Sequence, residues 1–94
     1  MKEITLFHLT NCPYCIHARH ALKELAEENP AYGEIAIHWI EEREEAALAA
    51  SFDYYYVPTV YYEGKKLYEA DPSQGYAEIK NSLKAALDTV LAAL

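Results

Sequence analysis

The chain has 94 residues and a net charge of −7, and its 52% hydrophobic and 24% charged residues are typical of one globular domain, which we expect to span residues 1–94. No basic cluster occurs, so neither nucleic acid nor an anionic membrane is expected as a partner. A strand-like run begins almost at Met1, which leaves no room for a signal peptide, and no apolar segment reaches membrane-spanning length. We therefore expect a cytoplasmic protein.

The first half of the chain predicts alternating strands and helices. Residues 4–9 are apolar on both faces, as expected for a strand that is covered on two sides. Residues 15–29 repeat apolar side chains at helical spacing, and Pro30 is expected to end that helix. A second strand is predicted over residues 34–40, and an alanine- and glutamate-rich helix over residues 42–52.

The second half predicts a hairpin and a long helix. Residues 59–62 and 66–68 flank a tight turn signal, Glu63-Gly64-Lys65, and are expected to be antiparallel strands. Residues 76–94 place their apolar side chains on one helical stripe. The predicted order of elements is therefore β-α-β-α-β-β-α.

The only two cysteines, Cys12 and Cys15, enclose Pro13 and Tyr14 at the junction of the first strand and the first helix. In a soluble chain with a strand-helix-strand pattern, this spacing indicates a dithiol redox site. Pro13 suits the first helical position, so Cys12 is expected at the N-cap, where free N–H groups and the helix dipole favour a thiolate. Cys15 lies one turn later on the apolar stripe and is expected to be buried. We predict that Cys12 is the nucleophile and that Cys15 resolves the mixed disulfide.

A metal half-site is the alternative interpretation of the two cysteines. Zinc takes about four ligands, which structural sites usually draw from further cysteines or spaced histidines. The candidates near the motif are His8, His17 and His20. We favour the redox interpretation and expect no metal.

The order of elements, the Cys-Pro-Tyr-Cys motif and the Val57-Pro58 pair before the third strand resemble the thioredoxin superfamily and, within it, the dithiol glutaredoxins. The resemblance covers nearly the whole chain. It implies an α/β, thioredoxin-like fold in which three helices flank a four-stranded mixed sheet. It also implies a monomeric thiol–disulfide oxidoreductase that acts on disulfide-containing or glutathionylated proteins with glutathione as the reductant.

The same resemblance suggests residues that hold the substrate. In similar proteins a cis-proline faces the dithiol, and the main chain of the preceding residue pairs with bound peptide or glutathione. Carried over, Pro58 fixes the loop and Val57 holds the substrate. Tyr14 resembles a tyrosine that lines the glutathione groove, while Tyr56 is predicted to form a docking surface beside Cys12.

Three positions depart from the glutaredoxin pattern. Thr10 stands in the glutathione site where typical glutaredoxins carry a lysine, so a cation for the glycine carboxylate is missing. Tyr68-Glu69 replaces the usual double glycine, which leaves Asp71 as the match to the acidic end of that motif. Two alternatives therefore stay open: a thioredoxin-like reductase of protein disulfides that a flavoprotein reductase serves, and a redox module that binds an iron–sulfur cluster or metal at Cys12.

Overall fold

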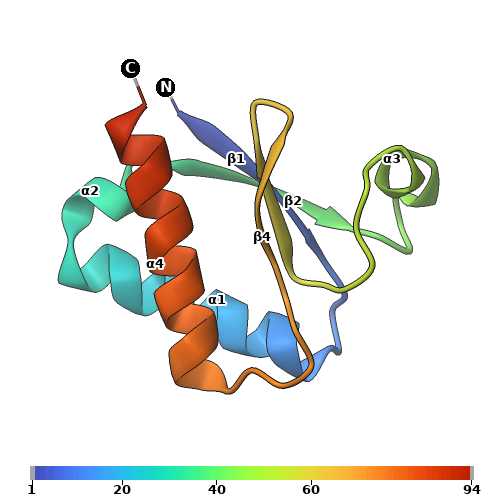
Figure 1. Cartoon of the computed structure of the whole chain (residues 1–94), viewed down its shortest axis with the longest axis horizontal. Helices are drawn as coiled ribbons and strands as arrows, with labels where there is room; N and C mark the ends of the chain where they lie inside the picture. Colours follow the sequence, from blue (N-terminus) through green and yellow to red (C-terminus); the bar gives the residue numbers. More distant parts are fainter. Residues whose placement is uncertain (1, 94) are drawn as a thin grey trace.

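The computed structural model describes residues 2–93 and contains a four-stranded sheet with the order β2-β1-β3-β4 (Figure 1). Strand β1 is parallel to β2 and antiparallel to β3, and β4 is antiparallel to β3. The predicted α/β fold and its mixed sheet are confirmed. The elements are β1 (Glu3–His8), α1 (Pro13–Glu28), α2 (Pro30–Gly33), β2 (Ala36–Glu41), α3 (Ala46–Ala50), β3 (Thr59–Tyr62), β4 (Lys65–Glu69) and α4 (Tyr76–Ala92).

Two helices differ from the sequence prediction. Pro30 ends α1 as expected, but it also starts the additional short helix α2, because proline is accommodated at the first helical position. The Asn29 side chain caps α2 by accepting a hydrogen bond from the Ala31 N–H at 3.1 Å. The helix predicted over residues 42–52 is reduced to α3, since residues 42–45 form turns around the Glu41 carbonyl. The predicted end of the last helix, Leu94, lies outside the described residues.

The two faces of the sheet are covered differently. Helices α1, α2 and α4 pack on one face, whereas α3 lies on the other side of the sheet (Figure 1). The first face buries the larger core, which includes Ile4, Leu6, Leu25, Val60, Ile79, Leu83 and Val90. Because α3 has only five residues, the second face relies on the segment between α3 and β3 for its cover.

An aromatic cluster provides that cover. The fully buried ring of Phe7 in β1 lies 4.8 Å from the ring of Phe52 and 4.9 Å from that of Tyr54, measured between centroids. Tyr61 of β3 packs edge-on against Phe52 at 4.9 Å. Offset and edge-to-face contacts of this kind are favoured by the charge distribution of aromatic rings. The cluster therefore anchors the segment that leads to Val57.

The hairpin of β3 and β4 contains a turn and an irregularity. Glu63 and Gly64 have φ values of 50° and 81°, the left-handed region that a two-residue hairpin turn of this kind requires. The pairing then shifts by one residue, because Val60 lies opposite Tyr68 whereas Tyr61 lies opposite Lys66. Leu67 is thus the extra residue of a β-bulge.

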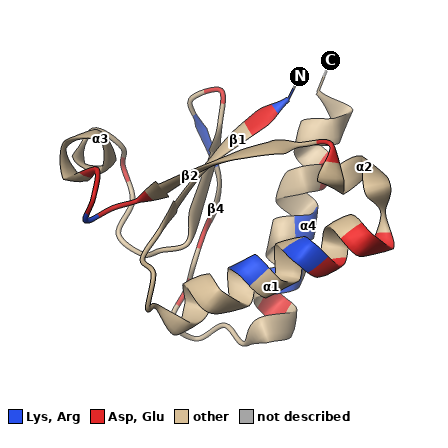
Figure 2. Cartoon of the chain, turned by 180° about the vertical axis from the view of Figure 1, so that it is seen from behind, with Lys and Arg blue, Asp and Glu red and all other residues tan. Residues whose placement is uncertain are grey.

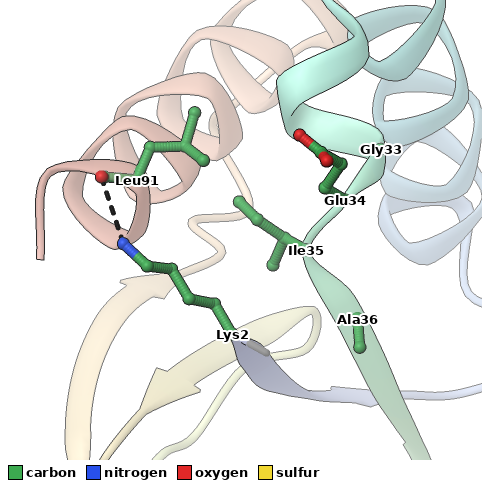
Figure 3. Close-up of a pocket in the computed structure, with 6 residues that line it drawn as sticks. All are labelled: Lys2, Gly33, Glu34, Ile35, Ala36 and Leu91. Atoms are coloured by element: carbon green, nitrogen blue, oxygen red, sulfur yellow. Dashed lines mark hydrogen bonds between the residues drawn. The ribbon is translucent and has the colours of Figure 1, made fainter. Parts of the chain in front are cut away.

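The ends of the described chain meet away from the cysteines. The Lys2 ammonium donates a hydrogen bond to the Leu91 carbonyl at 3.1 Å, at the C-terminal end of α4 (Figure 3). It also donates to the Val90 carbonyl at 2.8 Å. A cation there complements the negative end of the helix dipole. The adjoining cavity of about 620 Å³ opens beside Ile35 and the start of β2, at the end of β1 opposite to Cys12. None of the helices within residues 2–93 is long and apolar enough to cross a membrane.

Replacing Phe7 tests the aromatic cluster. Phe7→Ala removes a fully buried ring and leaves a cavity beneath the segment between α3 and β3, so we expect a loss of about 3–5 kcal/mol in the free energy of unfolding. Urea denaturation measures this loss. Ile16→Ala, at an exposed position of α1, is the control and is expected to change stability little. A loss below about 1 kcal/mol for Phe7→Ala would contradict the importance of the cluster.

Candidate active site

The two cysteines lie where β1 passes into α1. Cys12 is the N-cap residue of α1, with an extended backbone (φ −78°, ψ 126°), and Pro13 occupies the first turn. The Ile16 N–H donates to the Cys12 carbonyl at 3.0 Å, which begins the helical hydrogen bonding. Both sulfurs are free; Cys12 is partly exposed, and Cys15 is only 1% exposed. The placement that the sequence predicted for both residues is thus found.

The environment of Cys15 favours its neutral form. Burial, with a smaller contribution from the neighbouring Cys12 thiol, raises the pKa of the Cys15 thiol to about 12. A hydrogen bond from the Leu9 N–H, at 3.4 Å from the sulfur, acts in the opposite direction. At neutral pH, Cys15 in the reduced protein is therefore protonated. The Leu9 N–H is already positioned to stabilise a thiolate when one forms.

The segment before β3 approaches Cys12 from the other side. The Val57-Pro58 peptide bond is cis, and Pro58 is buried and accepts a hydrogen bond from the Ala70 N–H at 2.9 Å. The Val57 carbonyl lies 3.9 Å from the Cys12 sulfur and accepts its S–H. The Val57 N–H makes no hydrogen bond to any residue of the described chain, 2–93.

Tyr56 and Asp71 line one hollow, and Tyr14 contacts Pro72 at its edge. The Tyr14 hydroxyl donates to the Pro72 carbonyl at 2.9 Å, which links the cysteine motif to the segment after β4. A hollow of about 390 Å³ is lined by Tyr56, Glu69, Ala70, Asp71 and Pro72. The Asp71 carboxylate accepts hydrogen bonds from the N–H and hydroxyl of Ser73, each at 2.8 Å, and these bonds hold its pKa below the ordinary value.

Thr10 contacts the carboxylate of Glu41, a residue that the sequence did not indicate as part of the site. Its N–H and hydroxyl lie 3.4 and 3.2 Å from Oε2 of Glu41, which the Arg43 guanidinium also contacts at 2.9 Å. The hydrogen bond of the Arg43 side chain, followed by that of its N–H at 2.6 Å, lowers the pKa of Glu41 to about 2. On the opposite side, Arg19 donates to the Thr10 carbonyl at 3.0 Å. These contacts fix the segment that precedes Cys12.

The position of Glu41 corrects an expectation. An acidic run such as residues 41–45 is typical of solubilising surface charge, yet Glu41 is only 7% exposed. The reason is topological: the carboxyl ends of the parallel strands β1 and β2 meet at one edge of the sheet, which sets Glu41 beside the residues that follow β1. The parallel pairing of β1 and β2 was the signal that could have revealed the position of Glu41 beside the site.

Positive charge is absent from the loop between β1 and α1. Residues 9–12 contain no Lys or Arg, and this loop is uncharged in Figure 2. The hollow next to it is lined by two carboxylates, Glu69 and Asp71. Among residues 2–93, no group of three or more His, Cys, Asp or Glu side chains is arranged to hold a metal ion.

The sheet order, the cis-proline and the cysteine pair at the start of α1 define a dithiol protein of the thioredoxin superfamily. The sequence model of the Glutaredoxin family matches residues 4–67, more than half of the chain. The chain therefore belongs to the glutaredoxin family, as its sequence resemblance indicated. The family and the fold support a thiol redox function.

Solved structures share this fold. A malarial protein aligns with a TM-score of 0.64 and 17% identity, over 96% of this chain and 97% of its own. A mutant thioredoxin from Halobacterium salinarum NRC-1 aligns with a TM-score of 0.61 and 20% identity, over 98% and 76% of the two chains. A designed protein aligns with a TM-score of 0.55 and 20% identity, over 98% and 78%. A search of curated proteins found no match.

The depressed pKa of Glu41 predicts a pH-dependent contribution to stability. Because the pKa is lowered from 4.5 to about 2 on folding, the carboxylate stabilises the fold fully above about pH 4.5, and this contribution is lost as the pH falls toward 2. Glu41→Gln is therefore expected to be less stable than the wild type at pH 7, and the difference should narrow below pH 4.5.

Urea denaturation at several pH values measures this difference. Glu44→Gln makes the same chemical change at an exposed position of the same acidic run and serves as the control. A Glu41→Gln deficit that stays constant down to the lowest pH at which the protein is folded would show that the carboxylate charge contributes nothing.

Proposed function

We propose that the protein is a thiol–disulfide oxidoreductase of glutaredoxin type, which reduces protein disulfides or glutathione mixed disulfides through Cys12 and Cys15. One observation carries the proposal: the partly exposed Cys12 at the N-cap of α1 lies against the Val57 main chain, while Cys15 is buried one turn behind it. Accessibility and the free N–H groups of the helix favour attack by Cys12 rather than by Cys15.

In the first step the Cys12 thiolate attacks one sulfur of the substrate disulfide. The substrate S–S bond breaks as the bond to Cys12 forms, and the departing substrate thiolate takes a proton from solvent. An added strand of substrate is held by the Val57 main chain, whose N–H has no partner within residues 2–93. The substrate and the protein are then joined by a mixed disulfide.

In the second step Cys15 loses its proton and attacks the Cys12 sulfur. The second half of the substrate leaves as a thiol, and Cys12 and Cys15 become a disulfide. The high pKa of Cys15 keeps it protonated until then, and the Leu9 N–H stabilises the charge that forms. Two thiols of glutathione are the proposed reductant of that disulfide, each giving up one proton and one electron.

Glutathione fits the main-chain part of this site better than the charged part. The Val57 N–H and the hollow beside Tyr56 support pairing with its backbone. However, Thr10 offers no cation to its glycine carboxylate, and Glu69 and Asp71 repel anionic groups in the hollow. These same observations favour a second candidate function, the reduction of protein disulfides with electrons from a flavoprotein reductase.

Serine variants test the roles of the two cysteines. Cys12→Ser is expected to abolish exchange with every disulfide, because it removes the nucleophile. Cys15→Ser should still reduce a glutathionylated peptide, since free glutathione can attack the Cys12 mixed disulfide directly, but it should lose the reduction of protein disulfides. Product formation is followed by mass spectrometry. Activity of Cys12→Ser above the uncatalysed rate would refute the assignment.

The electron donor is tested on the wild-type protein. Its Cys12–Cys15 disulfide is incubated either with glutathione or with NADPH and a flavoprotein thioredoxin reductase, and free thiols are counted. Reduction by glutathione supports the glutaredoxin-type cycle. Reduction only by the reductase supports the second candidate, and reduction by neither would contradict both.

A further inference from the structure

We propose that Glu69 is a positioning residue, which together with Lys66 clamps the loop of residues 53–57 and so holds the Val57 main chain beside Cys12. This inference rests on the proposed function, because it concerns how substrate is received at the same site. Glu69 does not contact Cys12 in the structure; it acts through the loop.

The Glu69 carboxylate joins the loop to β4. Its Oε2 accepts hydrogen bonds from the main-chain N–H groups of Tyr55, at 2.7 Å, and Tyr56, at 2.9 Å. Its Oε1 accepts from the Lys66 ammonium at 2.7 Å. These three bonds, which hold the pKa of Glu69 below its ordinary value, keep the carboxylate charged at neutral pH. Hydrogen bonds to a charged acceptor are stronger than those between neutral groups.

Lys66 supplies a second connection to the same loop. Its ammonium lies 3.2 Å from the Asp53 carbonyl, which also accepts a hydrogen bond from the Tyr61 hydroxyl at 2.6 Å. The loop is thus bound at its start by Lys66 and Tyr61 and near its end by Glu69. The Thr59 hydroxyl adds a bond to the Tyr56 carbonyl, directly before Val57.

The β-bulge makes this clamp possible. In a regular strand, side chains three residues apart point to opposite faces of the sheet. The extra residue at Leu67 reverses that relation, so Lys66 and Glu69 lie on the same face, the one that also carries Tyr61. The bulge therefore has a function beyond bending the hairpin: it pairs a cation and an anion beneath the loop.

The clamp orders groups that would otherwise have to be ordered by substrate. Val57, two residues after Tyr55, provides the main chain against which substrate is proposed to pair. The rings of Tyr55 and Tyr56 are 89% and 52% exposed although their N–H groups are bound. A preorganised loop binds more tightly, because less conformational entropy is lost on association. Loosening it should weaken substrate binding while leaving the Cys12 thiol intact.

Three variants separate positioning from charge. Glu69→Gln removes the charge and leaves one acceptor oxygen, which can serve the loop N–H groups or Lys66 but not both, and Lys66→Met breaks the contacts with Glu69 and Asp53. Glu27→Gln on α1 makes the same charge change as Glu69→Gln at an exposed site remote from the loop. If Glu69 and Lys66 acted only through charge, their variants would move the KM for a charged disulfide peptide in opposite directions. Positioning predicts that both variants raise it.

We expect the KM for a disulfide-bonded peptide to rise roughly tenfold in Glu69→Gln and by less in Lys66→Met, while Glu27→Gln stays at the wild-type value. The alkylation rate of Cys12 by iodoacetamide should be unchanged in all three. Hydrogen exchange of the Tyr55 and Tyr56 N–H groups, followed by NMR, should accelerate in Glu69→Gln.

Two kinetic results would overturn the inference: wild-type KM in Glu69→Gln, or opposite shifts of the KM in the Glu69 and Lys66 variants. Both are distinguishable from failure of the proposed function, in which the wild-type protein itself would show no exchange with any disulfide. Hydrogen exchange gives a readout in either case, because it needs no activity. Unchanged exchange at Tyr55 and Tyr56 in Glu69→Gln would show that no clamp exists.

Discussion

The packing of Phe7 against Phe52 and Tyr54 is the contact on which the rest of the site depends. Strand β1 has two tasks: its carboxyl end leads to Cys12, and its Phe7 ring supports the segment that leads to Val57. The segment that carries Cys12 and the segment that carries Val57 are therefore both positioned by β1. Since protein interiors are close-packed, a shift of the Phe7 ring would move Val57 relative to Cys12.

Two carboxylates, together with the aromatic cluster, hold the loops that form the site. Glu41 binds the segment before Cys12, and Glu69 binds the segment before Val57. Each accepts from main-chain N–H groups and is accompanied by a cation of its own, Arg43 or Lys66. Part of the acidic excess of this chain therefore serves loop structure. Each of these carboxylates is balanced by its cation, and Arg19 lies on the Thr10 carbonyl, so both charged pairs serve the position of the loops beside Cys12.

Local patterns predicted the elements and the dithiol, whereas the loop contacts required the tertiary structure. Helical spacing and Pro13 were enough to place Cys12 at the N-cap and to bury Cys15, because both depend on residues within one turn. In the sequence, Glu41 stands in an acidic run and Glu69 replaces a usual glycine, and neither position indicates a contact with a loop. The loop residues that they bind, Thr10 for Glu41 and Tyr55 and Tyr56 for Glu69, are distant in the sequence. The bulge at Leu67, which turns Lys66 and Glu69 to one face, has no signature in the sequence. The extra helix α2 shows a smaller failure, since a proline that ends one helix can begin the next.

The contacts of Glu69 explain what the replacement of the usual double glycine changes in the site. A glycine at position 69 would leave the N–H groups of Tyr55 and Tyr56 available to water or to a bound ligand. Glu69 satisfies them from within the chain. Two N–H donors beside the hollow are thereby occupied, while the rings of Tyr55 and Tyr56 stay exposed. In the proposed function, substrate then pairs with the Val57 main chain and contacts these rings, and an extended polypeptide can make more of these contacts than a tripeptide can. Under the proposed function, the departures at Thr10 and Glu69 act in the same direction, and both favour the second candidate, the reduction of protein disulfides.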